Sequence, residues 1–206
     1  RIVTLAPSLT EFVFAVGAGE QLVGRDDLSD FPAEAADVAS IGSTFGEINT
    51  EAILALEPDL VLAAEINTPE QVQELESLGL TVFYVNNPTT IEELYGSLEN
   101  VAALTGQDAT GLIDSLKARV EAVTSAVATA AEKPTVFYEI DGTDPAKPWT
   151  TGPGTFMDTM ITMAGGINIG GVLSDSYAQI SVEEIVLQNP DVIVLGDTAF
   201  GVTIES

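Results

Sequence analysis

Residues 43–63 read STFGEINTEAILALEPDLVLA, and residues 175–195 repeat the pattern 132 positions later as DSYAQISVEEIVLQNPDVIVL. Average composition would give roughly one identity in such a window, whereas this pair has five. They are Ile48/Ile180, Glu51/Glu183, Ile53/Ile185, Pro58/Pro190 and Asp59/Asp191. Solenoid units recur every 20 to 50 residues or so, so a single repeat at this spacing predicts two similar lobes. A cleft between lobes is a common place to hold a small molecule.

Strand and helix patterns alternate on both sides of the first repeat. Apolar runs predict strands at residues 1–6, 22–24, 60–64 and 81–86, and helical patterns lie at about 9–17, 50–57, 69–78 and 91–105. Thr68 followed by Pro69 is a typical helix start. This alternation predicts an α/β fold with a mostly parallel sheet. Two further strands are expected at 135–140 and 191–195, after the rhythm has been interrupted.

A long helix is predicted in that interruption, from about Asp108 to Ala131. Its apolar stripe recurs at helical spacing through Leu112, Leu116, Val120, Val123, Val127 and Ala130. At 1.5 Å per residue the helix would run roughly 35 Å. A spine joining two lobes and an ordinary crossover helix within one sheet are both compatible with the stripe. The repeat lies on either side of the helix and favours the spine.

Composition limits the partners and the setting. The 206 residues include 32 acidic and 6 basic side chains, for a net charge of −26, and 46% are hydrophobic. The chain is therefore globular, and its charge repels phosphate backbones, so no nucleic-acid partner is expected. The charge indicates a highly solvated surface. Adaptation to salty or extracellular fluid is a sharper alternative.

Catalysis is not expected, because the chain has neither histidine nor cysteine. These absences remove the common general base, thiol nucleophile and soft metal ligands. The loop pair Asp26–Asp27 could hold a cation but is more typical of solvated carboxylates. Lys117, Lys133 and Lys147 are expected at exposed positions, and no phosphate loop or G-x-S-x-G motif is present. We predict no catalytic residues, no metal site and no cofactor.

No run of 18 apolar residues is present, so no membrane span is predicted. Arg1–Ala6 already reads as a strand, and a natural start would require Met. We therefore expect that a signal segment preceded Arg1 and was removed.

Several motifs, in order and with matching spacing, resemble the class III substrate-binding proteins of ABC importers, above all the cobalamin-binding members. The matching segments are RIVTLAPS with Thr10–Glu11, LVGR (22–25), SDFP (29–32), LEPDLVL (56–62), LESLG (75–79), TGPGTF (151–156) and AGGIN (164–168). The resemblance covers essentially the whole chain. It implies two α/β lobes joined by one long helix, with a ligand cleft between them. The expected boundaries are 1–106, 107–132 and 133–206, with a second lobe that is incomplete at Ser206.

The resemblance also implies a role. The protein would capture a metal chelate, favouring cobalamin or a related corrinoid over haem or an iron–siderophore, and deliver it to an ABC permease. It would work in the periplasm or outside the cell, with lipid anchoring left open. A ligand sensor without transport, or an enzyme on a related two-lobe fold, is the alternative from another class.

Six residues are candidate ligand contacts. Phe45 and Tyr177 occupy equivalent positions in the repeat, each expected in a loop before a helix, and facing aromatics could clamp a flat macrocycle. Both could instead be core residues of the lobes. Trp149 is expected in a loop, and Arg25 follows a strand, where it could meet a ligand or pair with Asp26 or Asp27. Tyr84 and Ser8 complete the set by resemblance, whereas Leu28 and Ala64 stand where the cobalamin binders have aromatics.

Glu51 and Glu183 lie six residues after Phe45 and Tyr177, each near a predicted helix start. A carboxylate there is favourable by about 0.3–1 kcal/mol, which is an ordinary reason for its presence. In the resembled family the matching glutamates meet arginines of the permease. The resemblance therefore implies a docking role, one glutamate on each lobe.

Overall fold

The computed structural model describes residues 1–44 and 46–198, so Phe45 lies outside the described residues. Two compact units divide the chain, Arg1–Ser115 and Leu116–Ser206. Each has its own sheet, which confirms the predicted two-lobe α/β class. The dividing point falls inside a helix, and the predicted boundaries at 106/107 and 132/133 stay predictions. In the described part of the chain, no helix is long and apolar enough to cross a membrane.

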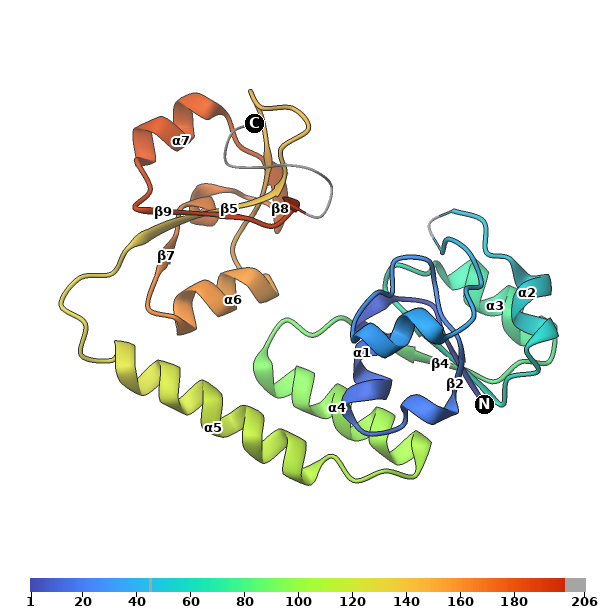
Figure 1. The fold of residues 1–206 in the computed structure, drawn as a ribbon. Coiled ribbons are helices and arrows are strands. Elements are labelled where there is room, and N and C mark those ends of the chain that lie inside the picture. Colours follow the sequence, from blue (N-terminus) through green and yellow to red (C-terminus); the bar gives the residue numbers. More distant parts are fainter. Residues whose placement is uncertain (45, 199–206) are drawn as a thin grey trace. The chain divides into compact units, whose positions relative to one another are not determined.

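The first unit is a parallel sheet covered by helices on both faces (Figure 1). Its strands are β1 (Ile2–Thr4), β2 (Leu22–Gly24), β3 (Leu60–Ala64) and β4 (Val82–Val85), in the order β2-β1-β3-β4. The helices are α1 (Pro7–Ala15), α2 (Thr50–Ala55), α3 (Pro69–Ser77) and α4 (Ile91–Thr105), with short 3-10 turns at Gly19–Gln21 and Ala33–Asp37. α1 and α4 pack together on one side of the sheet.

Alternation along the strands supplies the core of this unit. Val61 and Ala63 point to one face of β3, where they meet Ile53 of α2 and Leu75 of α3. All four side chains are fully buried. The helix start predicted at Thr68 is confirmed as a capping box, because the Thr68 hydroxyl accepts a hydrogen bond from the Gln71 N–H and the Gln71 side chain accepts one from the Thr68 N–H. The local start signal and the buried apolar face therefore agree on where α3 lies.

The long helix α5 runs unbroken from Thr110 to Val127, shorter at both ends than predicted. Asp108 accepts hydrogen bonds from the N–H and hydroxyl of Thr110, which fixes the start of the helix. The stripe is also corrected: Val123 is exposed and Thr124 is half-buried in its place. Thr124 lies four residues after Val120. The half-buried side of the helix therefore keeps the 3.6-residue period, with a polar residue at one of its positions.

The second unit adds antiparallel pairing to a parallel core. Its strands are β5 (Thr135–Asp141), β6 (Trp149–Thr151), β7 (Ile167–Asn168), β8 (Tyr177–Gln179) and β9 (Val192–Leu195). β7 and β9 pair in parallel with opposite edges of β5, while β6 pairs antiparallel with both β5 and β8. α6 (Phe156–Met163), a 3-10 turn at Ile169–Val172 and α7 (Val182–Gln188) complete it. Phe137, Ile169 and Ile180 form its buried cluster.

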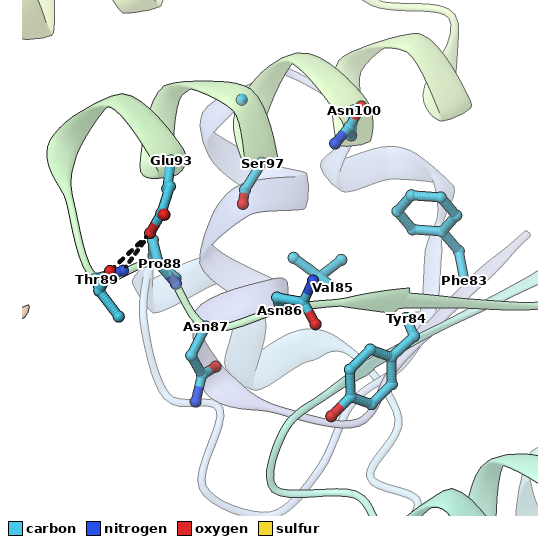
Figure 2. Close-up of a pocket in the computed structure, with 11 residues that line it drawn as sticks. Phe83, Tyr84, Val85, Asn86, Asn87, Pro88, Thr89, Glu93, Ser97 and Asn100 are labelled. Atoms are coloured by element: carbon cyan, nitrogen blue, oxygen red, sulfur yellow. Dashed lines mark hydrogen bonds between the residues drawn. The ribbon is translucent and has the colours of Figure 1, made fainter.

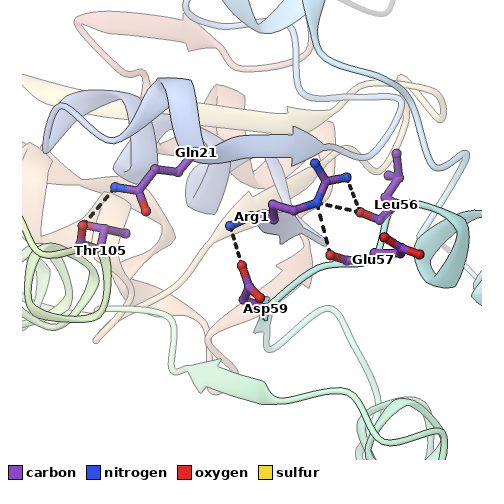
Figure 3. A network of polar contacts seen from close by, with 6 residues as sticks. All are labelled: Arg1, Gln21, Leu56, Glu57, Asp59 and Thr105. Atoms are coloured by element: carbon purple, nitrogen blue, oxygen red, sulfur yellow. Dashed lines mark hydrogen bonds and ion pairs between the residues drawn. The ribbon is translucent and has the colours of Figure 1, made fainter.

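The Pro-Asp step of the repeat makes the same joint in both units. The Asp59 N–H donates to the Arg1 carbonyl at 2.9 Å, and the Asp191 N–H donates to the Thr135 carbonyl at 2.9 Å. Each aspartate thereby fastens its strand beside the start of the neighbouring strand, β1 or β5. Figure 3 shows the first joint, where the Arg1 guanidinium also donates to the Leu56 and Glu57 carbonyls. The sequence repeat is therefore a structural repeat.

The residue before each proline is the second shared feature of this joint. Glu57 has a φ of 44° and Asn189 a φ of 46°. Among the described residues, these two alone have a positive φ without being glycine. The left-handed conformation ends the preceding helix and turns the chain into the strand.

Candidate functional site

The carboxyl edge of the first sheet gathers three of the predicted ligand residues. Ser8 follows β1, Arg25 follows β2 and Tyr84 lies near the end of β4. All four strands are parallel, so their carboxyl ends share one edge, where open α/β sheets bind ligands. Ser8 and Tyr84 are exposed there.

A pocket of about 530 Å³ opens beside Tyr84, between the end of β4 and α4 (Figure 2). Its volume is in the range of ordinary ligand sites. Apart from the glycine and apolar positions, it is lined by amides, hydroxyls and one acid. The lining residues are Phe83, Tyr84, Val85, Asn86, Asn87, Pro88, Thr89, Glu93, Gly96, Ser97 and Asn100.

Sequence reasoning missed the amide side chains of this pocket. Asn86, Asn87 and Asn100 are exposed, and their side chains make no hydrogen bond to any described residue. The available signal was the Asn86-Asn87-Pro88 run, which begins at the last residue of the strand predicted at 81–86 and is typical of a loop at the carboxyl edge. Each free amide offers both donors and an acceptor.

The acid of the pocket, Glu93, already accepts hydrogen bonds from the protein itself. Glu93 accepts hydrogen bonds from the Thr89 N–H at 2.7 Å, from the Thr89 hydroxyl at 2.9 Å and from the Thr90 N–H at 3.3 Å. These bonds, led by the Thr89 N–H, hold the pKa of Glu93 below its ordinary value. The described residues that line the pocket include no lysine or arginine, so their other polar groups are uncharged.

Arg25 binds the protein's own backbone. Its Nε donates to the Ala35 carbonyl at 2.7 Å and its Nη1 to the Asp26 carbonyl at 2.8 Å. The guanidinium thus holds the loop after β2, and among the described residues it donates to carbonyls, not to the carboxylates of Asp26 or Asp27. A ligand contact from Arg25 remains a prediction.

The carboxylates of Asp26 and Asp27 have different hydrogen-bond partners. Asp26 is buried and accepts from the Ser29 hydroxyl, which is bonded to Thr10, and Thr10 to Thr4. Asp27 instead accepts from Ser40. Among the described residues, no group of three or more acids, histidines or cysteines could hold a metal ion.

Trp149 and Tyr177 come together in the second unit. Both were expected in loops, but Trp149 begins β6 and Tyr177 begins β8. In this antiparallel pair Trp149 is opposite Gln179, and Thr151 is opposite Tyr177. The two aromatics therefore share one face as diagonal neighbours, about 7–8 Å apart. Trp149 is 43% exposed and Tyr177 is 50% exposed, so neither lies in the core.

A tight loop positions this aromatic pair. The Gly152 N–H donates to the Ser176 carbonyl at 2.7 Å, immediately before Tyr177. A Cβ on Gly152 would lie 2.1 Å from the Asp175 carbonyl oxygen, so only glycine allows the two segments to approach. The Thr155 hydroxyl accepts from the Asp158 N–H and begins α6 directly after this loop. The TGPGT sequence is thus the support of the β6–β8 face.

Glu51 and Glu183 occupy the same position in α2 and α7. Each is the second residue after its cap, and the caps are Asn49 and Ser181, which accept from backbone N–H groups. Both glutamates are exposed, and neither side chain has a hydrogen bond or ion pair with a described residue. Neither therefore caps its own helix.

Glu139 and Asp197 form a further carboxylate pair, near the ends of β5 and β9. Asp197 is buried and accepts from the Gly142 N–H at 2.8 Å. Burial raises the pKa of Glu139, and the charges of Asp197 and Asp141 raise it further. No sequence pattern singles out Glu139 and Asp197, because their proximity depends on the pairing of β5 with β9.

Comparison with known proteins identifies the family. A model described as "Periplasmic binding protein" matches residues 2–203. The chain belongs to this family. The resemblance seen in the sequence is thereby confirmed, and the family is one of binding proteins, which agrees with the prediction that the chain is not an enzyme.

Relatives in sequence carry names that concern cobalamin and ABC transport. The chain is 34% identical over 206 residues to a cobalamin-binding protein of Halobacterium salinarum, covering 97% of this chain and 54% of the relative. It is 32% identical to the uncharacterized ABC transporter substrate-binding lipoprotein YvrC of Bacillus subtilis, covering 96% of this chain and 63% of that one. The chain thus spans little more than half the length of these relatives.

Solved structures share the fold. The heme-binding protein RhuT from Roseiflexus sp. RS-1 superposes with a TM-score of 0.85 at 28% identity, covering 98% of this chain and 79% of RhuT. The vitamin B12-binding protein BtuF of Vibrio cholerae gives a TM-score of 0.80 at 26% identity, covering 98% and 78%. The two neighbours are named for different tetrapyrrole-type ligands, so fold similarity alone does not select the ligand.

Proposed function

We propose that this chain is the ligand-capturing part of an extracytoplasmic substrate-binding protein that delivers a metal chelate to an ABC permease. The match of the family model to residues 2–203 is the observation that carries this proposal. The relatives named as cobalamin-binding and as an ABC transporter lipoprotein support it. Location in the periplasm or outside the cell follows from the same role, and lipid anchoring is an extension of it by analogy with YvrC.

A corrinoid is the favoured ligand, on grounds of charge. Haem carries two carboxylates and many ferric siderophores are anionic, whereas the periphery of a corrinoid carries mostly uncharged amides. Within the described part of the chain, the pocket beside Tyr84 offers free asparagine amides and no basic side chain. A protein with a net charge of −26 would also repel an anionic chelate at long range. Haem or an iron–siderophore is the second candidate, supported by the heme-binding structural neighbours.

Trp149, Tyr177 and Tyr84 are proposed to supply the apolar contacts to the macrocycle, with Ser8, Arg25 and Phe45 as further contacts. Partly exposed aromatics offer large contact areas and lose few rotamers on binding. We propose that Glu51 and Glu183 contact basic residues of the permease. Both are exposed and have no side-chain partner among the described residues, which supports this role because the carboxylates are available to another protein.

The test uses the full-length gene product. The protein is incubated separately with cyanocobalamin, haemin and a ferric hydroxamate siderophore, desalted, and examined by visible absorption and thermal unfolding. Retained corrinoid absorbance with a raised melting temperature is expected, since a ligand of the folded state must stabilise it. Retention of haemin alone would select the second candidate. If no chelate is retained or raises the melting temperature, the chelate-binding role is wrong.

A sensor without transport would pass this test, so a second measurement is needed. Purified permease and ATPase, reconstituted with the loaded protein, should show ligand-stimulated ATP hydrolysis. Ligand binding without any stimulation would favour the sensor.

A further inference from the structure

The carboxylate of Glu93, in the pocket beside Tyr84, is held through only one of its two oxygens. The Thr89 N–H, the Thr89 hydroxyl and the Thr90 N–H all donate to Oε2 (Figure 2). Among the described residues, no donor to Oε1 is found. The side chain is exposed and lines the pocket. The carboxylate is therefore fixed in place by the protein, and Oε1 is available to accept a hydrogen bond from a ligand.

The charge of this carboxylate limits what can bind beside it. The same three hydrogen bonds lower the pKa of Glu93, so the group is ionised at neutral pH. A ligand carboxylate would meet it with like charge and no proton to share. The group that binds Oε1 must therefore donate a hydrogen.

The other polar groups of the pocket select among the possible donors. The side chains of Asn86, Asn87 and Asn100 each offer both donors and an acceptor. An ammonium group only donates, so the asparagine N–H groups would have no partner, and the positive end of α4 would repel it. A primary amide donates through its NH2 and accepts through its carbonyl. It is the uncharged group that matches both the carboxylate oxygen and the asparagine amides.

A glycine in α4 keeps room for such a group. Glu93, Gly96 and Asn100 follow one another at spacings of three and four residues, so they share one face of the helix. Glycine in a helix interior is destabilising relative to alanine. A Cβ on Gly96 would meet no heavy atom within 4 Å, so packing within the protein does not require glycine at this position. The missing side chain leaves the pocket open between Glu93 and Asn100.

We propose that Glu93 is a specificity-determining residue, whose Oε1 accepts a hydrogen bond from a primary amide on the periphery of the ligand and rejects a carboxylate at the same place. Asn86, Asn87 and Asn100 pair with the remaining donors and acceptors of that amide. This inference rests on the proposed function and deepens it, because it names the part of the corrinoid that is recognised and the residue that recognises it.

The test uses Glu93→Gln in the full-length gene product. Glutamine also forms a capping box, so its oxygen can keep the bonds to Thr89 and Thr90 while an NH2 group replaces Oε1. Glu92→Gln is the matched control, because Glu92 is exposed in the same helical turn and is not among the residues that line the pocket.

Dissociation constants are measured near neutral pH for cyanocobalamin and for the monocarboxylic acids made by hydrolysing one of its side-chain amides at a time. The unmodified protein should bind cyanocobalamin at least about tenfold more tightly than one of these acids. Glu93→Gln should lower that ratio at least about fivefold, because the new NH2 group opposes an amide donor and accepts a carboxylate. Glu92→Gln should keep the ratio.

The outcomes separate this inference from the proposed function. If the unmodified protein binds cyanocobalamin but does not distinguish it from any of the acids, or if Glu93→Gln leaves the ratio unchanged, the role of Glu93 is wrong and the proposed function stands. If the unmodified protein binds no corrinoid, both are wrong.

Filling the pocket gives a second measurement that does not alter the carboxylate. Gly96→Leu should weaken cyanocobalamin binding at least about tenfold without lowering the melting temperature, because the added side chain occupies the space of the amide. Gly111→Leu is the control, since Gly111 is also an exposed helical glycine with no heavy atom within 4 Å of an added Cβ. Equal affinity in the two variants would show that the ligand does not enter the pocket and would overturn the inference.

Discussion

Glu57 and Asn189 adopt the same left-handed conformation at the same joint, but they are not equally suited to it. Asparagine tolerates positive φ far better than glutamate, because its short polar side chain can bond to nearby backbone. The first unit therefore carries a local strain that the second avoids.

Exchanging the two residues should expose this strain. Glu57→Asn should stabilise the protein by about 0.5–1 kcal/mol, and Asn189→Glu should destabilise it by a similar amount. Thermal unfolding followed by circular dichroism would detect shifts of roughly 1–4 °C in opposite directions. Shifts in the same direction would mean that side-chain contacts, not φ, decide the effect.

The aromatic face of β6 and β8 should contribute to ligand binding. Tyr177→Ala or Trp149→Ala should weaken corrinoid affinity by about 1–3 kcal/mol, the apolar burial of one ring. Titration calorimetry on the full-length protein measures this change. Phe83→Ala alters the pocket lining in the first unit. Its effect on affinity shows how much this pocket contributes compared with the aromatic face of β6 and β8. Unchanged affinity in a folded Tyr177 variant would remove it from the site.

The raised pKa of Glu139 makes the free energy of unfolding depend on pH. Burial and two neighbouring carboxylates disfavour its charged form in the folded protein. Its pKa is therefore higher folded than unfolded, and stability is lost as pH rises from about 4.3, the unfolded value, through the folded pKa. Glu139→Gln should raise the melting temperature at pH 7 and have no such advantage near pH 4.

Asp191 is the opposite case and serves as the control. The Thr135 N–H and then its hydroxyl lower the pKa of Asp191, so its contribution is present above the unfolded value and is lost as pH falls through the folded pKa. Asp191→Asn should lower the melting temperature at pH 7. If Glu139→Gln and Asp191→Asn shift the melting temperature in the same direction at pH 7, the loss of charge is not the cause of the shifts.

At the scale of the element, α2 and α7 each present one glutamate to solvent in the same helical position. Glu51→Lys and Glu183→Lys should leave ligand affinity unchanged. Each should reduce ligand-stimulated ATP hydrolysis at least about tenfold, because like charges across an interface oppose docking, and the double variant should be worst. Salt weakens exposed pairs, so the assay belongs at low ionic strength.

Glu70 of α3 is the matched control for these reversals. It is also exposed, follows its cap by two residues and lies outside the repeat. Glu70→Lys disturbs the helix dipole to the same extent and should leave transport intact. Normal stimulation in the double variant at Glu51 and Glu183 would contradict the docking role.

Elements with local signals were predictable from sequence, and elements made by distant contacts were not. Thr68–Pro69 marks the start of α3, and the apolar stripe predicts α5. The end of α5 was placed too late, because Ala128 to Ala131 are compatible with a helix and no breaker occurs before Pro134. β6 and β8 have three residues each and are defined by pairing with one another.

The candidate site follows the same division. The positions of Ser8, Arg25 and Tyr84 at a strand end were predictable, because strand ends are marked in the sequence. The partners of Arg25 were not, because the Ala35 carbonyl reaches it through the path of a loop. The proximity of Trp149 and Tyr177, 28 residues apart in the chain, depends on the register of two short strands.

At the scale of the whole molecule, charge is the dominant feature. With 32 acidic and 6 basic side chains, few carboxylates can find a cationic partner. Raising ionic strength from about 0.01 to 1 M shortens the Debye length from about 30 to 3 Å and screens this repulsion. The melting temperature measured by calorimetry should therefore rise with NaCl, by roughly 5 °C or more.

A variant with fewer acids provides the comparison. Neutralising Glu70, Glu74 and Glu76 to glutamine removes three charges from α3 and should reduce the slope of melting temperature against salt. A melting temperature that stays flat or falls with salt would mean that self-repulsion does not limit stability.

The pairing of strand β9 has a consequence for aggregation. Val192–Leu195 is an uninterrupted aliphatic, uncharged run, and among the described strands it pairs only with β5. An edge of this type can add strands from other molecules. Pro190 and Asp191 directly before it are placed as gatekeepers that interrupt such growth. The carboxylates of Asp191 on neighbouring molecules repel one another only while they are unscreened. High salt, which should stabilise each folded molecule, should also remove the barrier to fibrillar stacking wherever this edge is uncovered.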